Sequence, residues 1–520
     1  MVDILIIGGG GAGLTAAIHA KKNGANVTLV SKTYPTRSQT CMAQGGINAA
    51  IGANDSIQSH ISDTLKSAQG LADEELVGIL CEQGIDAIKW LDRIGVPFSR
   101  DNGIAQRKMG GASFVRACYA KDYTGLKILH TLYDQCNAYD INMLSERFLI
   151  DLAVIDGKVY GAYLLNIKTS TVELLHAKSV VLATGGYAKV YGKHSTNHVG
   201  STADGIAAAL RAGAKISNME FIQFHPTALK KSSILISESA RGAGGYLVNS
   251  KAKRFTDELA SRDKVSLAIT NEMQKGEEIY LDVRHLSAKF INEHLPQEKK
   301  LADLYENIDL TKQLIPILPA AHYTMGGICV DKNCATNVQG LYAVGECANH
   351  MVHGANRLGG NSLLEIVVFG KIAGEAACAY TKKEMPACKA DKHKDIPSQI
   401  NTNPTVDFYK KRTELAEIFY TNVGVKRNEQ GLLVALEYIQ VLQDELKNMG
   451  VKNTKLAYNT ELAEFLEFKN IVLVAKTVVL SALRRKESRG AHYREDMPNK
   501  DDNYSADTIC YQENDEIKFL

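Results

Sequence analysis

The feature that most constrains this chain is a glycine run, GGGGAG at residues 8–13. It lies between an apolar strand pattern at 2–7 and a helix-like segment at 14–22, and a second apolar strand pattern follows at 27–31. In such a β-α-β unit, the first glycine of G-x-G-x-x-G permits a tight turn, the second lets the backbone approach a pyrophosphate, and the third lets the helix pack closely on the strand. The sequence therefore predicts a dinucleotide site with phosphate contacts from Gly8, Gly10, Gly11, Ala12 and Gly13.

Composition disfavours several classes of function. The 520 residues carry 60 Lys and Arg against 58 Asp and Glu, and a net charge of +2 attracts neither nucleic acid nor anionic lipid. No apolar run reaches the roughly 18 to 20 residues of a membrane span, and no signal peptide pattern precedes the first strand. We therefore expect a cytoplasmic protein with no direct membrane span and no nucleic-acid partner. The ten cysteines form no C-x-x-C pair, which predicts reduced thiols and no metal site.

The order of the strand and helix patterns predicts a discontinuous first domain. A strand at 179–183 runs into Thr-Gly-Gly, the pattern then changes, and a strand at 340–346 is followed by an apolar helix at 362–380. A polar segment with two prolines at 381–402 is typical of a linker. The predicted parts are a nucleotide-binding domain at 1–220 and 322–380, an inserted domain at 221–321, a helical domain at 403–483 and a polar, irregular tail at 484–520.

The segment after the second strand, KTYPTRSQTCMAQGGINAA at 32–50, resembles the flavin-attachment segment of succinate dehydrogenase and fumarate reductase flavoprotein subunits. The resemblance implies an α/β fold, in which a Rossmann-like FAD-binding domain carries an inserted α+β capping domain and is followed by a C-terminal helical domain. In that family a histidine directly follows Arg-Ser and is bonded covalently to FAD, whereas this chain has Gln39 there. An amide offers no nucleophilic imidazole nitrogen, so we expect FAD to be held without a covalent bond.

The resemblance implies further FAD contacts beyond the glycine run. An aspartate at a helix start is by itself more often an N-cap, and a Gly-Glu pair at a strand end is otherwise an ordinary turn. The acidic residue that usually binds ribose at the end of the second strand is absent, because that strand ends in Ser-Lys. The contacts implied by the resemblance are Ser31, Lys32, Ser38, Gln39, Thr40, Gln44, Gly45, Gly46, Thr184, Gly185, Asp204, Glu346, Asn361, Ser362 and Leu363.

Five short motifs carry residues that suit a small dianion: FHPT at 224–227, SESAR at 237–241, ASRD at 260–263, HYTMGG at 322–327 and HGANR at 353–357. Taken singly, each His or Arg reads as an ordinary buried or ion-paired side chain. Together, two His, a hydroxyl and two Arg can hold two carboxylates, since Arg binds a carboxylate bidentately. The resemblance implies substrate contacts from His225, Ser237, His322 and Arg357, with Ser237 where the family has Thr.

The resemblance also implies the catalytic residues. In the family, hydride passes between the flavin and one methylene carbon, while an arginine that matches Arg262 transfers a proton at the adjacent carbon. An arginine is a poor acid because its ordinary pKa lies above about 12, so it needs tight positioning and fast reprotonation. Glu238 and Arg241 match a proposed relay for that purpose.

Two other functions remain open. An L-aspartate oxidase would place a glutamate before the Gly-Gly pair at 110–111 to meet the substrate ammonium, and Met109 carries no charge there. A non-catalytic flavoprotein scaffold would have no reason to retain His225, Arg262, His322 and Arg357 together. Loss of the covalent bond is associated in the family with weak succinate oxidation, which favours fumarate reduction, although these residues serve both directions.

The electrons on the flavin must be exchanged with another protein, because the sequence shows no ligands for an iron–sulfur cluster. The resemblance implies an iron–sulfur subunit, and through it either a quinone-reactive membrane anchor or a thiol-oxidising subunit. The chain would then lie on the inner face of the cell membrane through its partners. The charged tail at 484–496 resembles the family's C-terminal segment, for which we expect contact with the flavin domain or a partner rather than catalysis.

Overall fold

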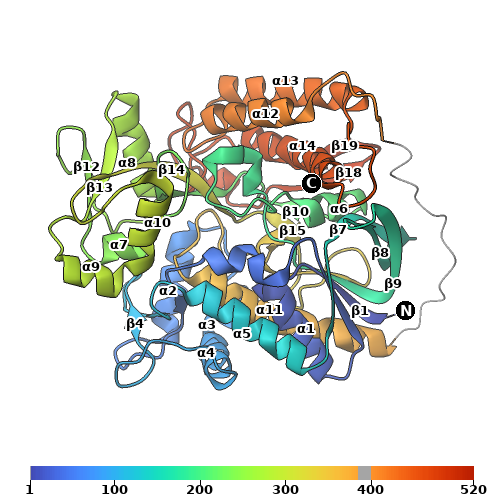
Figure 1. Cartoon of the computed structure of the whole chain (residues 1–520), viewed down its shortest axis with the longest axis horizontal. Helices are drawn as coiled ribbons and strands as arrows, with labels where there is room; N and C mark the ends of the chain where they lie inside the picture. The colour runs from blue at the N-terminus through green and yellow to red at the C-terminus, as the bar shows by residue number, and fades with distance from the viewer. Residues whose placement is uncertain (1, 384–399) are drawn as a thin grey trace.

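A computed structural model describes residues 2–383 and 400–520, so most of the predicted linker lies outside the described residues (Figure 1). A parallel sheet has the order β6-β2-β1-β9-β16, and β7 and β8 extend it as an antiparallel arm from β9. The strands are β1 (Val2–Ile7), β2 (Val27–Ser31), β6 (Asn142–Ser145), β7 (Arg147–Ile155), β8 (Lys158–Asn166), β9 (Thr171–Leu182) and β16 (Leu341–Ala343). The chain returns to this sheet through β16, which pairs in parallel with β9.

Helices α1 (Gly11–Lys22) and α11 (Asn361–Lys383) pack closely on each other beside this sheet. Glycine allows that approach, because a Cβ at Gly374 would lie 2.3 Å from the carbonyl oxygen of Ala16. The N-terminus of α1 is thereby fixed directly after β1. The remaining elements of the first 140 residues are β3 (Ile47–Asn48), α2 (Ile57–Ala68), α3 (Glu74–Glu82), α4 (Gly84–Arg93), β4 (Gln106–Arg107), β5 (Ala117–Cys118) and α5 (Thr124–Ala138).

The four-stranded antiparallel sheet β11-β14-β13-β12 and the helices between its strands form a separate layer, which we call the cap (residues 222–324; left in Figure 1). It has its own apolar core, which includes Leu247, Ile269 and Leu281. The sequence pattern shows alternating strands and turns, and the structure adds four helices. The elements are β11 (Ile222–Leu229), α7 (Glu238–Gly242), β12 (Tyr246–Asn249), α8 (Arg262–Gln274), β13 (Ile279–Asp282), α9 (Ala288–His294), α10 (Pro296–Glu306) and β14 (Ile315–Thr324).

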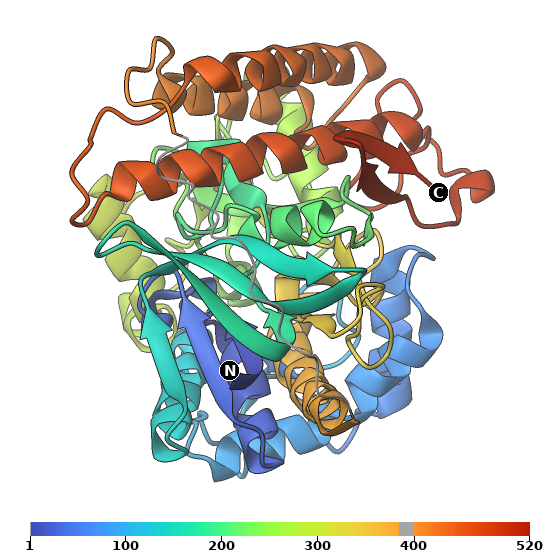
Figure 2. The same cartoon turned by 90° about the vertical axis from the view of Figure 1, so that its right-hand side faces the viewer.

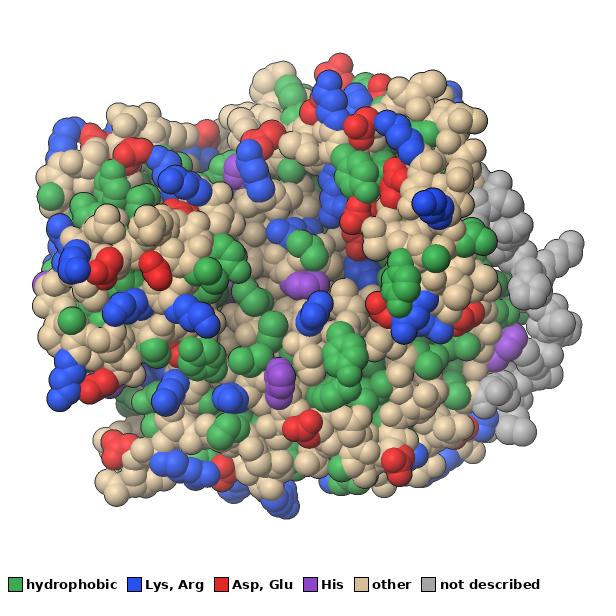
Figure 3. Space-filling view, in the orientation of Figure 1, with side chains coloured by type: hydrophobic (Ala, Val, Ile, Leu, Met, Phe, Trp, Pro, Cys, Tyr) green, Lys and Arg blue, Asp and Glu red, His purple; other side chains and the backbone are tan. Residues whose placement is uncertain are grey.

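Three helices after residue 400 match the predicted helical periodicity: α12 (Phe408–Asn422), α13 (Glu429–Glu445) and α14 (Thr460–Arg484). Helix α14 packs on α13 and on α6 (Asp204–Arg211), and Figure 2 shows it crossing the width of the molecule. No helix within the two described ranges is long and apolar enough to cross a membrane. On the face in Figure 3, acidic and basic side chains are interspersed, in keeping with the small net charge.

The tail is more ordered than its polar sequence suggests. A hairpin of β18 (Ile509–Glu513) and β19 (Glu516–Phe519) joins a small sheet through β10 (Ile216–Ser217), which also pairs with β15 (Gly327–Cys329). The charged run is not a solvated face, because Arg485 is buried and donates from Nε to Glu220 Oε1 at 2.6 Å. The tail therefore has no regular strand or α-helix over 485–508 and ends in this hairpin, and buried ion pairs hold part of its charged run against the rest of the fold.

Candidate active site

A long cavity begins at the glycine run, where β1 passes into α1. A Cβ on Gly8 would lie 2.0 Å from the carbonyl oxygen of Ala183, and one on Gly13 would lie 1.9 Å from the carbonyl oxygen of Gly8. Gly10 caps α1 without a side-chain hydrogen bond, so the N-terminal amides after that of Gly11 remain available to a ligand. Amides and the helix dipole at this point favour an anion, as a pyrophosphate requires.

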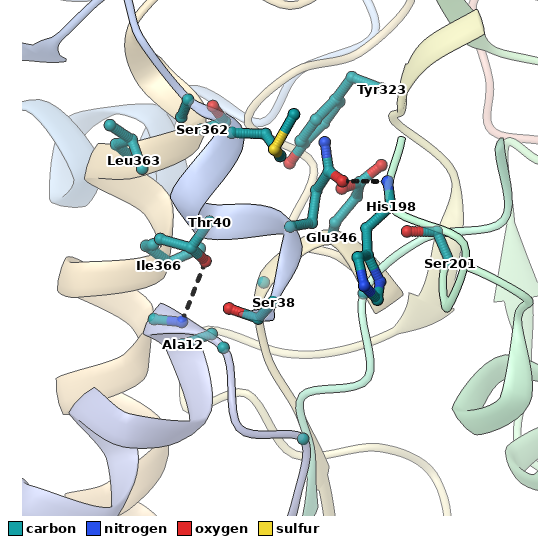
Figure 4. Close-up of a pocket in the computed structure, with 18 of the residues that line it drawn as sticks. Ala12, Ser38, Thr40, His198, Ser201, Tyr323, Glu346, Ser362, Leu363 and Ile366 are labelled. Atoms are coloured by element: carbon teal, nitrogen blue, oxygen red, sulfur yellow. Dashed lines mark hydrogen bonds between the residues drawn. The ribbon is translucent and has the colours of Figure 1, made fainter. Parts of the chain in front are cut away.

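Several polar atoms that line the cavity are buried without a hydrogen-bond partner among the described residues: Ser38 Oγ, Thr184 Oγ1 and Gln44 Oε1. Thr40 is already engaged, since its Oγ1 accepts the backbone N–H of Gly11 at 3.1 Å (Figure 4). Buried polar atoms without partners are costly, so their convergence on one cavity indicates that a polar ligand completes them. These residues and the open amides of α1 fit the pyrophosphate and polar edges of FAD.

Asp204 and Lys32 both line this cavity, and their side chains form an ion pair with each other. Lys32 Nζ lies 2.6 Å from Asp204 Oδ2 and 2.7 Å from Glu467 Oε1, and its other partners include Thr202. Glu467 belongs to α14, so the C-terminal helices reach the wall of the cofactor cavity. Glu467 was not among the predicted site residues. Helical periodicity alone does not distinguish a charged side chain that points toward the cavity wall from one on a solvated helix face.

Gln39 also lies in the cavity, where its side-chain oxygen is engaged with the polypeptide. Oε1 accepts the backbone N–H of His198 at 2.5 Å, and this bond is the dashed line that ends at His198 in Figure 4. His198 itself lines the cavity, and burial followed by the charge of Lys32 lowers the pKa of its imidazole. His198 is a second residue that the sequence analysis missed, since it lies in no motif used there.

Glu346 lies across the cavity from the glycine run, and its side chain is partly buried. Burial raises the pKa of its carboxyl to about 7, although its Oε1 accepts the backbone N–H of Thr324 at 3.0 Å. Ser362 and Leu363, at the start of α11, face the cavity close by (Figure 4). Two predicted contacts do not line the cavity: Gly13, which packs on Gly8, and Asn361, which bonds to Asn48 and His60 behind the wall.

The other end of the same cavity collects side chains from the cap and from the loop before α11. They are His225, Ser237, Glu238, Arg262, His322 and Arg357, together with Met109 and Tyr323. A bulge in β14 contributes to this arrangement, because Gln223 pairs with Tyr323 and Phe224 with Ala321, which leaves His322 as an extra residue. Bulges redirect side chains near functional sites, and the His322 ring lies with its centroid 5.0 Å from that of His225.

Both imidazoles are neutral. Burial lowers the pKa of His225 and of His322 well below the ordinary value, and the charge of Arg262 acts in the same direction. Nδ1 of His225 accepts the backbone N–H of Thr227 at 3.3 Å, so in the neutral ring Nε2 carries the hydrogen. His225 therefore offers a hydrogen-bond donor from Nε2.

Arg262 and Glu238 are the first residues of the cap helices α8 and α7, and they form a buried ion pair. Arg262 Nε and Nη2 donate to Glu238 Oε2 at 3.0 and 2.9 Å, and Glu238 Oε1 accepts the backbone N–H of Gly110. Burial acts to raise the pKa of Glu238, but the charges of Arg262 and Arg241 outweigh it, so the pKa is lowered and the carboxylate is ionised. The guanidinium of Arg262 is thus held in a fixed plane at the cavity wall.

Arg241 does not line the cavity and lies buried behind Glu238. Its Nη1 donates to the carbonyl oxygen of Glu258, whereas Nε and Nη2 have no partner in residues 2–383 and 400–520. Arg357 faces the cavity from outside the cap and lies over the ring of Tyr323 at 4.2 Å from its centroid. Burial, followed by the charge of Arg262, lowers the pKa of Arg357 to about 10.

Fold and cavity define a class: a protein with a Rossmann-like dinucleotide site that opens onto a pocket of buried cationic and imidazole groups. The family model for an FAD binding domain matches residues 3–363, and that for the fumarate reductase flavoprotein C-terminus matches residues 412–519.

Named relatives cover nearly the whole chain. The flavoprotein subunit of 8-methylmenaquinol:fumarate reductase from Wolinella succinogenes is 40% identical, over 96% of this chain and 86% of that protein. The succinate dehydrogenase flavoprotein subunit of Rickettsia conorii is 37% identical, over 96% of this chain and 91% of that protein. A solved structure of quinol–fumarate reductase with menaquinol molecules superposes with a TM-score of 0.95 at 35% identity, over 100% of this chain and 97% of that chain. The chain belongs to the family of succinate dehydrogenase and fumarate reductase flavoprotein subunits, which are FAD-dependent oxidoreductases.

Proposed function

We propose that this chain interconverts fumarate and succinate as the flavoprotein subunit of a larger complex. The observation that carries the proposal is the single cavity that joins a dinucleotide cradle to His225, Ser237, Arg262, His322 and Arg357. FAD, when bound, supplies or accepts the hydride. The protein supplies orientation, charge complementarity and the proton.

The carboxylates of a four-carbon diacid would be held by neutral donors and one cation. Nε2–H of His225 and the guanidinium of Arg357 suit carboxylate oxygens, and Arg357 binds them bidentately. Ser237 is the N-cap of α7, where its Oγ accepts the backbone N–H of Ser239 at 3.2 Å and leaves its own hydrogen free for substrate. Met109 contributes only apolar surface beside these residues, which supports a diacid rather than an amino acid as substrate.

Arg262 would give its proton to one carbon of fumarate, or take it from succinate in reverse. Glu238 holds the Arg262 plane through two hydrogen bonds and pairs electrostatically with Arg241 on the side away from the cavity. We infer that Glu238 and Arg241 restore the proton on Arg262 between turnovers. Arg241 suits this role because two of its nitrogens are free of other partners among the described residues.

We further propose that FAD is bound without a covalent link, because Gln39 presents an amide where the family has a histidine. The domains would be 1–220 with 322–380 for FAD, 221–321 as the capping domain, 403–483 as the helical domain and 484–520 as the tail; the last strand of the cap runs on to Thr324. The family resemblance leads us to propose an iron–sulfur partner and, through it, a quinone-reactive anchor or a thiol-oxidising subunit. Relatives named as subunits of a menaquinol-dependent fumarate reductase support the quinone route. This chain would then lie peripherally at the inner face of the membrane.

The function is tested on purified FAD-loaded protein in two assays, reduced viologen with fumarate and succinate with an artificial electron acceptor. Turnover in either assay supports the proposal, and a higher rate with fumarate would assign the direction. L-aspartate in place of succinate is the control for the amino-acid alternative. If fumarate and succinate are both inert while FAD is bound, the chain is a scaffold and the proposal is wrong.

A further inference from the structure

Gln223 lies between the two active-site arginines and makes four side-chain hydrogen bonds, two of them with the guanidinium groups. It is completely buried on β11, two residues before His225. Its Oε1 accepts from Arg262 Nη1 at 3.0 Å and from Arg357 Nη2 at 3.1 Å. Its Nε2 donates to Asn356 Oδ1 at 2.8 Å and to the carbonyl oxygen of Arg357 at 2.9 Å. The amide thus uses its whole hydrogen-bonding capacity.

These partners fix which way the amide of Gln223 points. The reversed orientation would place NH2 hydrogens against two guanidinium groups, which are donors only, and the amide oxygen against the carbonyl oxygen of Arg357. The oxygen therefore lies between the two cations. A neutral acceptor at this place draws the arginines together without cancelling the charge of either.

Gln223 also joins two parts of the fold. Arg262 is the first residue of α8 in the cap, whereas Arg357 lies in the loop before α11, outside the cap. The strand register places Gln223 opposite Tyr323, the residue whose ring Arg357 covers. One side chain therefore sets the distance between the cap arginine and the arginine of the facing loop.

The charge of the bridging group matters because the cavity already contains one anion, the carboxylate of Glu238, bonded to Arg262. A second carboxylate at position 223 would pair with both arginines, as charge-assisted hydrogen bonds are stronger than neutral ones. Two carboxylates would then face two arginines, and little positive charge would remain for a dianion. An amide of the same size avoids this.

We propose that Gln223 is a positioning residue that sets the spacing of Arg262 and Arg357 and, by being neutral, leaves their positive charge uncancelled, so that it attracts the dianionic substrate. This inference rests on the proposed function, because it assumes a dicarboxylate in the cavity. It assigns a specificity role to a residue that itself need not touch the substrate.

Three variants separate charge from spacing. Gln223→Glu keeps the shape and adds a negative charge, and Gln223→Met keeps the length but removes all four hydrogen bonds. Gln274→Glu makes the same chemical change on an exposed residue at the opposite end of α8 and serves as the matched control. Each variant is compared with the wild type for bound FAD per chain, malonate affinity by calorimetry, and kcat and KM for fumarate.

We expect Gln223→Glu to bind FAD as the wild type does and to bind malonate at least about tenfold more weakly. Gln223→Met should bind malonate within about threefold of wild type, since both charges remain, while kcat falls by roughly tenfold or more because Arg262 loses its position. Gln274→Glu should match the wild type in all measurements.

Unchanged malonate affinity in Gln223→Glu would overturn the inference. Equal losses of affinity, kcat and FAD in the Glu and Met variants would also overturn it, because they would show a general structural role. Failure of Gln223→Glu to fold counts against it as well, since a carboxylate between two arginines relieves their repulsion. If the wild type itself neither binds malonate nor turns over fumarate, the proposed function fails instead.

Discussion

Asp122 and Glu298 share a hydrogen bond between two buried carboxyl groups, with Asp122 just before α5 and Glu298 on α10 of the cap. Burial, followed by this contact with Asp122, raises the pKa of Glu298 to about 8. Asp122 Oδ2 accepts the backbone N–H of Gln297 at 2.7 Å, and Glu298 Oε1 accepts the hydroxyl of Ser239 at 2.8 Å. The oxygen that remains on each carboxyl has no other donor in the described part of the chain, which is the arrangement that a proton shared by the two carboxyl groups would complete.

The shared proton predicts that stability falls as the pH rises. Because the pKa of Glu298 is about 8 in the folded protein and about 4.5 when unfolded, the folded state binds more protons in this window. From pH 6 to 8 the loss for this group is at most about 3 kcal/mol, because each unit of pH corresponds to roughly 1.4 kcal/mol. Arg107, Tyr119 and Tyr123 are the other titratable groups around the pair.

Glu298→Gln should remove much of this pH dependence, since an amide can donate to Asp122 and still accept from Ser239 at every pH. The measurement is the thermal midpoint of the FAD-loaded protein at pH 6, 7 and 8, beside Glu293→Gln, which changes an exposed carboxyl on the neighbouring α9. A decline in Glu298→Gln as steep as in wild type and in Glu293→Gln would show that the pair does not share a proton.

The flavin should leave the protein on acid denaturation, because Gln39 has no nucleophilic nitrogen and its oxygen accepts the backbone N–H of His198. After trichloroacetic acid precipitation, we expect all flavin absorbance in the supernatant. Yellow colour or flavin fluorescence retained in the washed pellet would contradict the prediction. Gln39→His is the informative companion variant, although an imidazole alone need not produce attachment.

Substitution of the two arginines should give different kinetic defects. Arg262→Ala removes the proton donor, so kcat for fumarate should fall by roughly 1,000-fold or more while FAD remains bound. Arg357→Ala removes a carboxylate contact, so KM should rise, by about 100-fold if the lost contact is charge-assisted. Steady-state kinetics with flavin spectra as the folding control separate the cases, and a change in KM alone for Arg262→Ala would remove that residue from the chemical step.

The sequence was sufficient to predict those cavity residues that belong to short, recognisable motifs. The glycine run gave the turn between β1 and α1 because only glycine tolerates the contact of Gly8 with Ala183. His225, Ser237, Arg262, His322 and Arg357 were expected to meet through a resemblance, and the structure brings their side chains to one cavity. Their chemical roles remain proposals.

The contacts that the sequence did not reveal depend on tertiary structure. Glu467 reaches Lys32 only because α14 packs over α6, and Gln223 meets both arginines only because the cap faces the loop before α11. Neither position differs in local pattern from a residue on a solvated helix or an ordinary strand. The bulge that directs the His322 side chain toward the cavity likewise depends on strand register, which residue types alone do not specify.

The cap should close over the flavin when a dicarboxylate binds, because neither part of the fold surrounds the substrate alone. His225, Ser237 and Arg262 belong to the cap, whereas Arg357 and most of the predicted FAD contacts lie outside it. Closure would exclude water and strengthen each charge contact. The chain crosses between the two parts near 219–221 and 320–323, where we expect the hinge.

Hydrogen exchange with and without malonate tests this motion on the FAD-loaded protein. Malonate should slow exchange of backbone amides in α7 and α8 more than in α12 and α13, which lie in the helical part and contribute no residue to the cavity. Local contact with the ligand could protect the first turn of each cap helix, so the decisive amides are those at the far end of α8, near Gln274. Protection there requires movement of the cap as a body, whereas protection limited to the cavity wall, or equal protection in α13, would leave a preformed site as the better description.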